Sequence, residues 1–183
     1  MWDNIFRQQP KKSKHALLRR VPMFADLDRR ELYEVEKLLY RRNYDEGEVI
    51  FRQNDPGVGM YVIESGRVEI LHEPSGRHLA ELGDGDFFGE IALLNETPRS
   101  ARATALAPTV LYGLFQPELY DVFERLPRLG VKLLLPLAQM LGARLLRADD
   151  ELQSLDEQIA LLREPAASAE SDHPNGASHA SLD

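Results

Sequence analysis

Apolar residues recur at helical spacing over the first part of the chain, from about Lys11 to Tyr40. A first apolar stripe begins at Leu17 and Leu18 and is interrupted at Pro22, which lacks the N–H group that a helix interior needs. Asp28 can cap a second helix by accepting hydrogen bonds from the free N–H groups of its first turn. The second helix carries apolar residues at helical spacing, namely Leu32, Val35, Leu38 and Leu39. The pattern therefore predicts helices ahead of the main domain.

Between residues 41 and 115 the period of the pattern changes from helical to two. Apolar residues alternate with other residues in short stretches, as in Tyr61 and Ile63, Val68 and Ile70, and Val110, Tyr112 and Leu114. Turn signals rich in Gly, Asp, Asn and Pro separate these stretches, at residues 45–47, 54–57, 65–66, 74–76 and 83–86. Turns at roughly 8–12-residue intervals are typical of a sandwich or barrel of short antiparallel strands. The sequence therefore predicts an α+β chain in which an antiparallel β-barrel is flanked by helices.

A helical pattern returns after the predicted barrel. Residues 118–126 suggest a short helix that Pro127 ends, and a long helix is predicted from Leu129 to about Leu162. Two registers of a seven-residue repeat are apolar throughout the long helix: Val131, Ala138, Leu145, Leu152 and Ile159 in one, and Leu134, Leu141, Ala148, Leu155 and Leu162 in the other. Such a repeat is typical of a coiled-coil seam. Pro136 falls inside the repeat and is expected to kink or interrupt the helix near its start.

This seam allows two interpretations. The early part is expected to pack on the chain's own barrel, whereas the later part has too little barrel left to cover it, which favours a homodimer. The flanking charges give a mixed signal for parallel pairing, because Arg144 would meet Asp149 of the partner while Glu151 would face Asp156. The sequence therefore favours a dimer through the long helix and leaves its orientation open.

The chain has 183 residues and a formal net charge of −8, which is unevenly placed. Residues 148–183 hold nine acidic side chains against one basic side chain, Arg163, whereas residues 7–20 hold six basic side chains and no acid. An acidic C-terminal part is a poor surface for DNA, because affinity for DNA depends largely on neutralising phosphates. The basic segment is interpreted as a solvated helix face, with an acidic partner or a membrane as the alternative.

Composition bounds the class of protein further. The chain has no cysteine, which excludes disulfides and thiolate metal sites. It also lacks a run of 18 apolar residues and an apolar signal-peptide core, so we expect a cytoplasmic protein with no membrane span. The expected divisions are an N-terminal extension at residues 1–14, a main domain at 15–147 with its barrel at about 41–115, a continuation of the long helix at 148–163 and a disordered acidic tail at 164–183.

Candidate chemistry is concentrated in residues 88–101, which read Phe-Gly-Glu-Ile-Ala-Leu-Leu-Asn-Glu-Thr-Pro-Arg-Ser-Ala. Gly89 allows backbone to approach a ligand, and the apolar run from Ile91 to Leu94 predicts a short helix whose first N–H groups favour a phosphate. Arg99 can add a two-pronged contact to the same phosphate. Glu90 would repel that anion, so we expect it to hold a neutral donor such as a ribose hydroxyl. The segment therefore predicts a site for a small phosphorylated sugar.

This segment closely resembles the phosphate-binding cassette of cyclic-nucleotide-binding domains, the module of catabolite activator proteins and of cAMP-dependent kinase regulatory subunits. The family pattern runs Phe-Gly-Glu-Leu/Ile-Ala-Leu, a short gap, and Arg-Ser/Ala-Ala, and every position is filled here. Similar strand and turn patterns at residues 47–51, 60–68 and 82–88 extend the resemblance over roughly residues 15–147. It implies a two-layer jelly roll, in agreement with the turn spacing. The alternative is a buried turn and helix with a solvated Glu90 and Arg99.

The resemblance also implies roles for individual residues of this cassette. Arg99 would pair with a cyclic phosphate with help from the Ser100 hydroxyl, while Glu90 and the Gly89 backbone would take the 2′-hydroxyl. Further phosphate donors would be the backbone N–H groups of Ile91, Ala92 and Ala101.

Contacts to the base are implied on the long helix. Arg144 aligns with a family arginine near the ligand, and Asp149 falls where base contacts usually arise. Arg102 is a third candidate for a base contact. It stands where the family pattern associates Thr or Ser with cGMP, so the resemblance favours cAMP as the ligand, with cGMP as the alternative.

We therefore expect a stand-alone cyclic-nucleotide receptor, not an enzyme, that signals to a protein partner through a conformational change of its C-terminal helix. No Ser/His/Asp set, paired carboxylates or metal-ligand framework stands out, and no cofactor is expected. No helix-turn-helix pattern follows the long helix, so DNA is not the expected output. The alternative, from a different class, is an interaction or scaffold module that binds no nucleotide and dimerises through the long helix.

Overall fold

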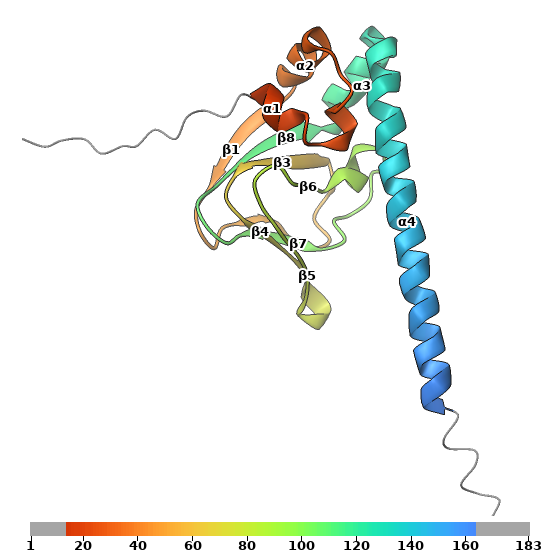
Figure 1. Ribbon diagram of the computed structural model, residues 1–183. Coiled ribbons are helices and arrows are strands. Elements are labelled where there is room, and N and C mark those ends of the chain that lie inside the picture. The colour runs from red at the N-terminus through yellow and green to blue at the C-terminus, as the bar shows by residue number, and fades with distance from the viewer. Residues whose placement is uncertain (1–13, 164–183) are drawn as a thin grey trace, which may run out of the picture. The chain divides into compact units, whose positions relative to one another are not determined.

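The structure, a computed structural model, describes residues 14–163 of the chain (Figure 1). The expectations for the N-terminal extension, whose apolar residues are Trp2, Ile5 and Phe6, and for the acidic tail from residue 164 lie outside the described residues. Of the described residues, 14–140 form one compact unit and 141–163 form a second.

Two four-stranded antiparallel sheets form the centre of the first unit. One sheet has the order β1-β8-β3-β6, with strands β1 (Tyr40–Tyr44), β8 (Thr109–Phe115), β3 (Gly59–Ser65) and β6 (Phe87–Phe88). The other has the order β2-β7-β4-β5, with strands β2 (Val49–Phe51), β7 (Arg102–Ala105), β4 (Val68–His72) and β5 (Arg77–Leu82). Strands distant in sequence are therefore neighbours within each sheet, as in a double-sheet jelly roll. The predicted fold class, an antiparallel barrel with flanking helices, is confirmed.

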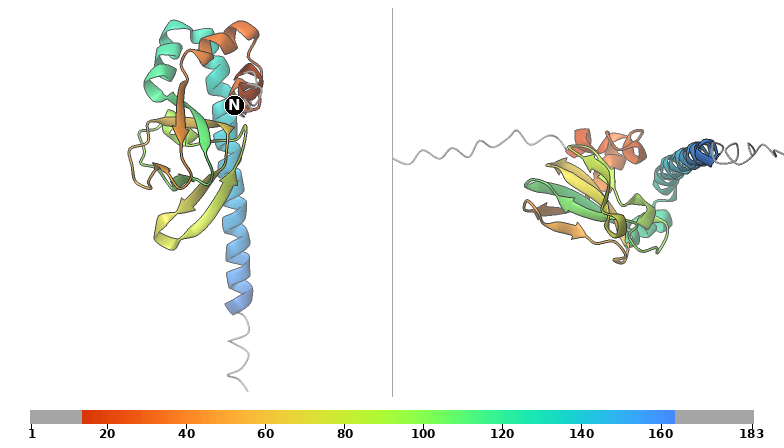
Figure 2. Two further views of the ribbon diagram at one scale, coloured as in Figure 1. Left: turned by 90° about the vertical axis from the view of Figure 1, so that its left-hand side faces the viewer. Right: turned by 90° about the horizontal axis from the view of Figure 1, so that it is seen from below.

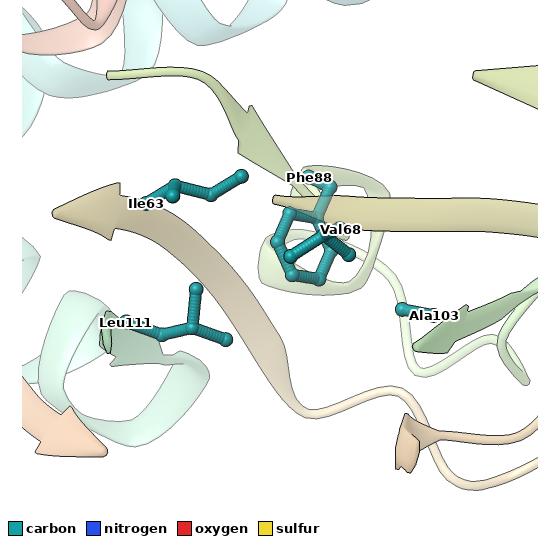
Figure 3. Close-up of a cluster of buried hydrophobic side chains, with 5 residues drawn as sticks. All are labelled: Ile63, Val68, Phe88, Ala103 and Leu111. Carbon is teal, nitrogen blue, oxygen red and sulfur yellow. The ribbon is translucent and has the colours of Figure 1, made fainter. Parts of the chain in front are cut away.

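The core of this sandwich lies between the two sheets. Ile63, Phe88 and Leu111 come from the first sheet, and Val68 and Ala103 come from the second (Figure 3). All five side chains are buried. Because successive residues of a strand point to opposite faces, the period-two pattern of the sequence brings such residues to the inside.

Four helices lie at one end of the sheets (Figures 1 and 2): α1 (Lys14–Leu18), η1 (Pro22–Phe24), α2 (Arg29–Glu36) and α3 (Gln116–Arg125). The tip of the β4–β5 hairpin, which contains η2 (Glu73–Ser75), lies at the other end. The predicted cap of α2 is confirmed. The Asp28 carboxylate accepts hydrogen bonds from the N–H groups of Arg30 and Glu31, and the Glu31 carboxylate accepts one from the Asp28 N–H. The N-terminal helical region is shorter than predicted, because strand β1 already begins at Tyr40.

Helix α4 (Pro127–Arg163) begins directly after α3, close to the break predicted at Pro127. It continues through Pro136, so the helix is not interrupted there, and the expected kink stays a prediction. Proline removes a single N–H donor, and the burial of Leu133 and Leu137 on either side stabilises the helix in this region.

The stripe that packs α4 on its own unit is not the predicted seam. Leu129, Leu133 and Leu137 are buried, whereas the seam residues Val131 and Leu134 are 64% and 40% exposed. The expectation that the early seam packs on the barrel is therefore wrong, because a second apolar stripe on another face of the helix makes that contact. Later seam residues are exposed as well, namely Leu145, Leu152, Leu155, Ile159 and Leu162.

Helix α4 is also long and apolar enough to cross a membrane by length and composition alone, since an 18-residue window has a mean hydropathy of 1.4. This test is weak on its own, because a core helix of a soluble protein passes it as well. Leu129, Leu133 and Leu137 of α4 are buried in the first unit, and 22% of the apolar window is buried. The absence of a membrane span stays a prediction.

Candidate functional site

The predicted cassette follows strand β6 and forms a tight turn and a short helix. Gly89 adopts a φ of +77°, a conformation that residues with a side chain rarely take, and it precedes the 3-10 helix η3 (Glu90–Leu93). The short helix predicted over Ile91–Leu94 is therefore present, one residue earlier. A Cβ atom on Gly89 would lie 2.6 Å from Nη1 of Arg99. The turn thus needs glycine both for its backbone conformation and for the space that Arg99 occupies.

The backbone of Arg99 is fixed by the loop that joins β2 and β3. Its N–H donates to the carbonyl of Asp55 at 2.9 Å, and its carbonyl accepts from the N–H of Asn54 at 2.9 Å. The same loop approaches the cassette at Gly57, where a Cβ atom would lie 2.4 Å from the carbonyl oxygen of Thr97. Arg99 is therefore placed by a segment far from it in sequence.

The guanidinium of Arg99 is buried, with 6% of the residue exposed. Nη1 donates a hydrogen bond to the Gly89 carbonyl oxygen at 3.2 Å, and Cζ lies 4.2 Å from the centre of the Phe51 ring. Nε is also buried, but it makes no hydrogen bond within the described residues. An unsatisfied donor on a buried cation is costly, and an anionic acceptor would satisfy it.

The surroundings of Arg99 affect the pKa of its guanidinium in two opposite directions. Burial lowers the pKa of its guanidinium, while the nearby Tyr61, Glu90 and Asp55 raise it. Arginine remains protonated at any physiological pH, so the site holds a buried positive charge. Glu90 is buried as well, with 1% of the residue exposed. The structure thus brings Gly89, Glu90 and Arg99 together, and it excludes the alternative in which Glu90 and Arg99 are solvated.

The other predicted residues of the cassette differ from one another in their hydrogen bonds and in their exposure to solvent. The N–H of Ala92, expected to face a phosphate, donates to the Gly89 carbonyl oxygen at 3.3 Å within η3. Ser100 is exposed and Ala101 is buried, so the two lie on opposite sides of the chain after Arg99. The Ile91 side chain is 43% exposed.

The three candidate base contacts lie on strand β7 and on helix α4. Arg102 alternates along β7 with the core residue Ala103, and its Nη1 lies 3.7 Å from Oε1 of Glu73. The side chain of Arg102 therefore points away from the core between the two sheets. On that outer face it forms the ion pair with Glu73. Arg144 and Asp149 are exposed residues of α4 in the second unit. Their base contacts stay predictions.

Phe51, Tyr61 and Asp55 lie around Arg99 but were not predicted as site residues. The only signal in the sequence is the turn at residues 54–57, which predicts a loop without indicating what it contacts. No spacing rule connects that loop or the end of β2 to Arg99, because both contacts come from the pairing of distant strands.

Two other features bear on the chemistry. A cavity of about 520 Å³ lies between α2 and the α3–α4 junction, away from the cassette. Its lining residues are Arg30, Glu31, Glu34, Arg125, Leu126, Pro127, Arg128 and Leu129. Within residues 14–163, no group of three His, Asp or Glu side chains is arranged to hold a metal ion.

The sequence of the chain matches a known protein family. Residues 41–126 match the sequence model of the family described as the cyclic nucleotide-binding domain. The chain is 38% identical over 142 residues to the cyclic AMP receptor protein of Thermus thermophilus. That alignment covers 76% of this chain but 64% of the relative, so the chain spans slightly less than two thirds of that protein.

Solved structures show the same likeness. The crystal structure of Thermus thermophilus catabolite activator protein matches with a TM-score of 0.67 and 38% identity, over 74% of this chain and 63% of that one. A cyclic nucleotide-binding domain from Methylobacillus flagellatus matches with a TM-score of 0.66 and 25% identity, over 77% and 83% of the two chains. The residues that match the family model, 41–126, include nearly all of both sheets, the cassette and helix α3.

Proposed function

This chain belongs to the cyclic-nucleotide-binding domain family, as its sequence resemblance implied, and we propose that it is a receptor for cAMP. The observation that carries this proposal is the buried Arg99 beside the left-handed turn at Gly89, because its Nε makes no hydrogen bond to any of residues 14–163. The relative from Thermus thermophilus is a cyclic AMP receptor protein, which supports the choice of ligand.

The cyclic phosphate is bound by Arg99. Its anionic oxygens accept hydrogen bonds from the guanidinium and so satisfy the buried Nε donor. The Ser100 hydroxyl and the backbone N–H groups of Ile91, Ala92 and Ala101 complete this subsite. The N–H of Ala92 shifts from its long hydrogen bond with Gly89 to do so.

The ribose is held by Glu90 and the Gly89 backbone. A buried carboxylate is a strong acceptor for the 2′-hydroxyl, because a charge-assisted hydrogen bond in a desolvated site is worth about 1.5–3 kcal/mol. Glu90 also partly balances the charge of Arg99 before the nucleotide arrives. Because Arg99 binds the phosphate and Glu90 binds the 2′-hydroxyl, the carboxylate does not face the anionic phosphate.

The base is bound by α4, through Arg144 and Asp149. The carboxylate of Asp149 accepts a hydrogen bond from the exocyclic amino group of adenine, which is absent from that position of guanine. The ion pair of Arg102 with Glu73 weakens the case for Arg102 as a base contact. cGMP remains the alternative ligand.

The output is a conformational change of α4 that is transmitted to a protein partner. cAMP must bind one arrangement of this helix more tightly than another for such signalling to work. The five acidic residues of the helix after Ala148 disfavour DNA as the partner, because they repel phosphates: Asp149, Asp150, Glu151, Asp156 and Glu157. The receptor is a homodimer joined by the exposed seam of α4, and it acts by binding, without catalysis.

Calorimetric titration with cAMP, cGMP and a cyclic dinucleotide tests this proposal. We expect saturable binding with one nucleotide per chain, with the highest affinity for cAMP. Equal or tighter binding of cGMP would contradict the choice of cAMP and leave the receptor role intact. A folded protein that gives no heat with any of the three would contradict the receptor role itself.

A second candidate is favoured by the exposed seam alone. Leu145, Leu152 and Leu162 are 63%, 60% and 78% exposed, so α4 can join two chains whether or not a nucleotide is bound. In that case the chain is a scaffold module that binds no nucleotide. Sedimentation and calorimetry together distinguish the two functions, because a scaffold would sediment as a dimer and yet give no heat of binding with cAMP, whereas the receptor would give both.

A further inference from the structure

The guanidinium of Arg99 lies over the ring of Phe51. Cζ of Arg99 lies 4.2 Å from the centre of this ring, well inside the distance of about 6 Å for a cation–π interaction. The ring of Tyr61 is farther away, at 5.9 Å. Phe51 is the last residue of β2 and lies 48 residues before Arg99 in the sequence. It therefore contacts Arg99 only because the fold brings β2 and the cassette together.

Phe51 is itself held by the core. Its ring lies 5.8 Å from the ring of Phe88 and 6.1 Å from the ring of Tyr61, and these two rings stack on each other at 5.5 Å. The aromatic face offered to Arg99 is consequently fixed in position. A side chain with more conformational freedom at position 51 would not fix the orientation of the guanidinium.

The contact with Phe51 differs from a hydrogen bond in one important respect. A carbonyl or carboxylate that stabilises a guanidinium uses one of its N–H donors, all of which lie in the plane of the group. An aromatic ring attracts the cation through the face of the ring. A guanidinium that lies parallel to the ring therefore keeps its in-plane N–H donors available for a ligand. In Arg99 only Nη1 is used by Gly89, and Nε makes no hydrogen bond within the described residues.

We infer that Phe51 is a positioning residue for the nucleotide phosphate, which it serves by holding the Arg99 guanidinium flat with its N–H donors directed to the ligand. This inference rests on the proposed function. The benefit to affinity comes from preorganisation, because an arginine already held in place loses less side-chain freedom when the ligand binds.

The first test compares the affinity for cAMP of the wild type, Phe51→Leu, Phe51→Tyr and Phe115→Leu. The control Phe115 is also half-buried and packs on Tyr61 at 6.1 Å, but it is not stacked on Arg99. We expect Phe51→Leu to bind cAMP about 3- to 30-fold more weakly, the range of a cation–π contact. Phe51→Tyr should bind like the wild type, because it keeps the ring, and Phe115→Leu should lose stability without losing affinity. Unchanged affinity in Phe51→Leu, or an equal loss in Phe115→Leu, would overturn the inference.

The second test needs no nucleotide. The Nε–H resonance of Arg99, identified by its disappearance in Arg99→Lys, should be shifted by the ring current of Phe51 in the ligand-free protein. We expect this shift in the wild type and in Phe51→Tyr but not in Phe51→Leu, and its absence from the wild type would overturn the stacking. If the wild type shows the shift but does not bind cAMP, the proposed function fails while the stacking stands. If the wild type binds cAMP but Phe51→Leu changes neither the affinity for cAMP nor the Nε–H shift, the inference about Phe51 fails while the proposed function stands.

Discussion

Gly89 and Arg99 share a space that holds only one side chain. A Cβ atom on Gly89 would lie 2.6 Å from Nη1 of Arg99, and the Gly89 carbonyl oxygen accepts a hydrogen bond from the same Nη1 at 3.2 Å. The glycine thus both makes room for the arginine and orients it. Its φ of +77° adds a second reason for glycine at this position.

Replacing Gly89 with alanine should impair folding and binding together. The left-handed conformation costs a residue with a side chain about 1–3 kcal/mol, and the new methyl group displaces the Arg99 guanidinium. We expect a lower free energy of unfolding and an affinity for cAMP reduced by at least about tenfold, which corresponds to about 1.4 kcal/mol. Gly76→Ala is the matched control, because Gly76 has a φ of +63° with nothing within 4 Å of its Cβ position. If Gly76→Ala weakened binding as much as Gly89→Ala, backbone strain alone would explain the effect.

The role of Glu90 can be separated from that of Arg99 by changing the ligand. Glu90→Gln replaces a charged acceptor with a neutral one, so we expect roughly tenfold weaker binding of cAMP. The loss should be much smaller for 2′-deoxy-cAMP, which lacks the hydroxyl that Glu90 is proposed to hold. Calorimetry on the two proteins with the two nucleotides gives this comparison. An equal loss for both nucleotides would show that Glu90 does not bind the 2′-hydroxyl.

Local pattern was sufficient to predict much of the fold and the centre of the site. Period-two alternation and regular turns predicted the two sheets, Asp28 predicted the cap of α2, and the order of residues in the cassette predicted that Gly89 and Arg99 act together. These features depend on residues close in sequence. What could not be predicted depends on the pairing of distant strands, as in the contact of Phe51 with Arg99.

The long helix shows the same limit in another form. Its sequence contains several apolar stripes, and periodicity alone does not say which one faces the chain's own core. The seam containing Val131 and Leu134 was expected there, but the stripe of Leu129, Leu133 and Leu137 is the buried one. Which stripe is buried depends on how α4 leaves α3, and the sequence pattern does not define that geometry.

The exposed seam of α4 should be the dimer interface. We expect the double substitution Leu152→Ala and Leu155→Ala to raise the dimer dissociation constant by at least about 100-fold, since each buried leucine contributes about 2–5 kcal/mol. Leu146→Ala with Leu161→Ala is the control, because these leucines are 66% and 68% exposed but lie outside the seam. Sedimentation over a range of concentrations measures both. A wild type that stays monomeric, or a control that dissociates equally, would rule out this seam.

Acid should remove the stabilising effect of the Asp28 cap. Hydrogen bonds from the backbone N–H groups of Glu31 and Arg30 lower the pKa of Asp28 below its ordinary value of 3.8. The cap therefore contributes stability above pH 3.8, and this contribution is lost as the pH falls through the lower pKa of the folded protein. We expect the difference in melting temperature between the wild type and Asp28→Ala to shrink on acidification. Asp28→Asn, which caps without a titrating group, should differ from Asp28→Ala by a constant amount.

The most direct measurement is the calorimetric titration of cAMP into the wild type and into Arg99→Gln, after circular dichroism has shown that both are folded. We expect saturable binding by the wild type and an affinity about 30- to 5,000-fold lower for Arg99→Gln. This range corresponds to the 2–5 kcal/mol or so that is lost when one partner of a buried charge pair is removed. Equal affinity of the two proteins for cAMP would contradict the assignment of the phosphate to Arg99, and the absence of binding by the folded wild type would contradict the receptor itself.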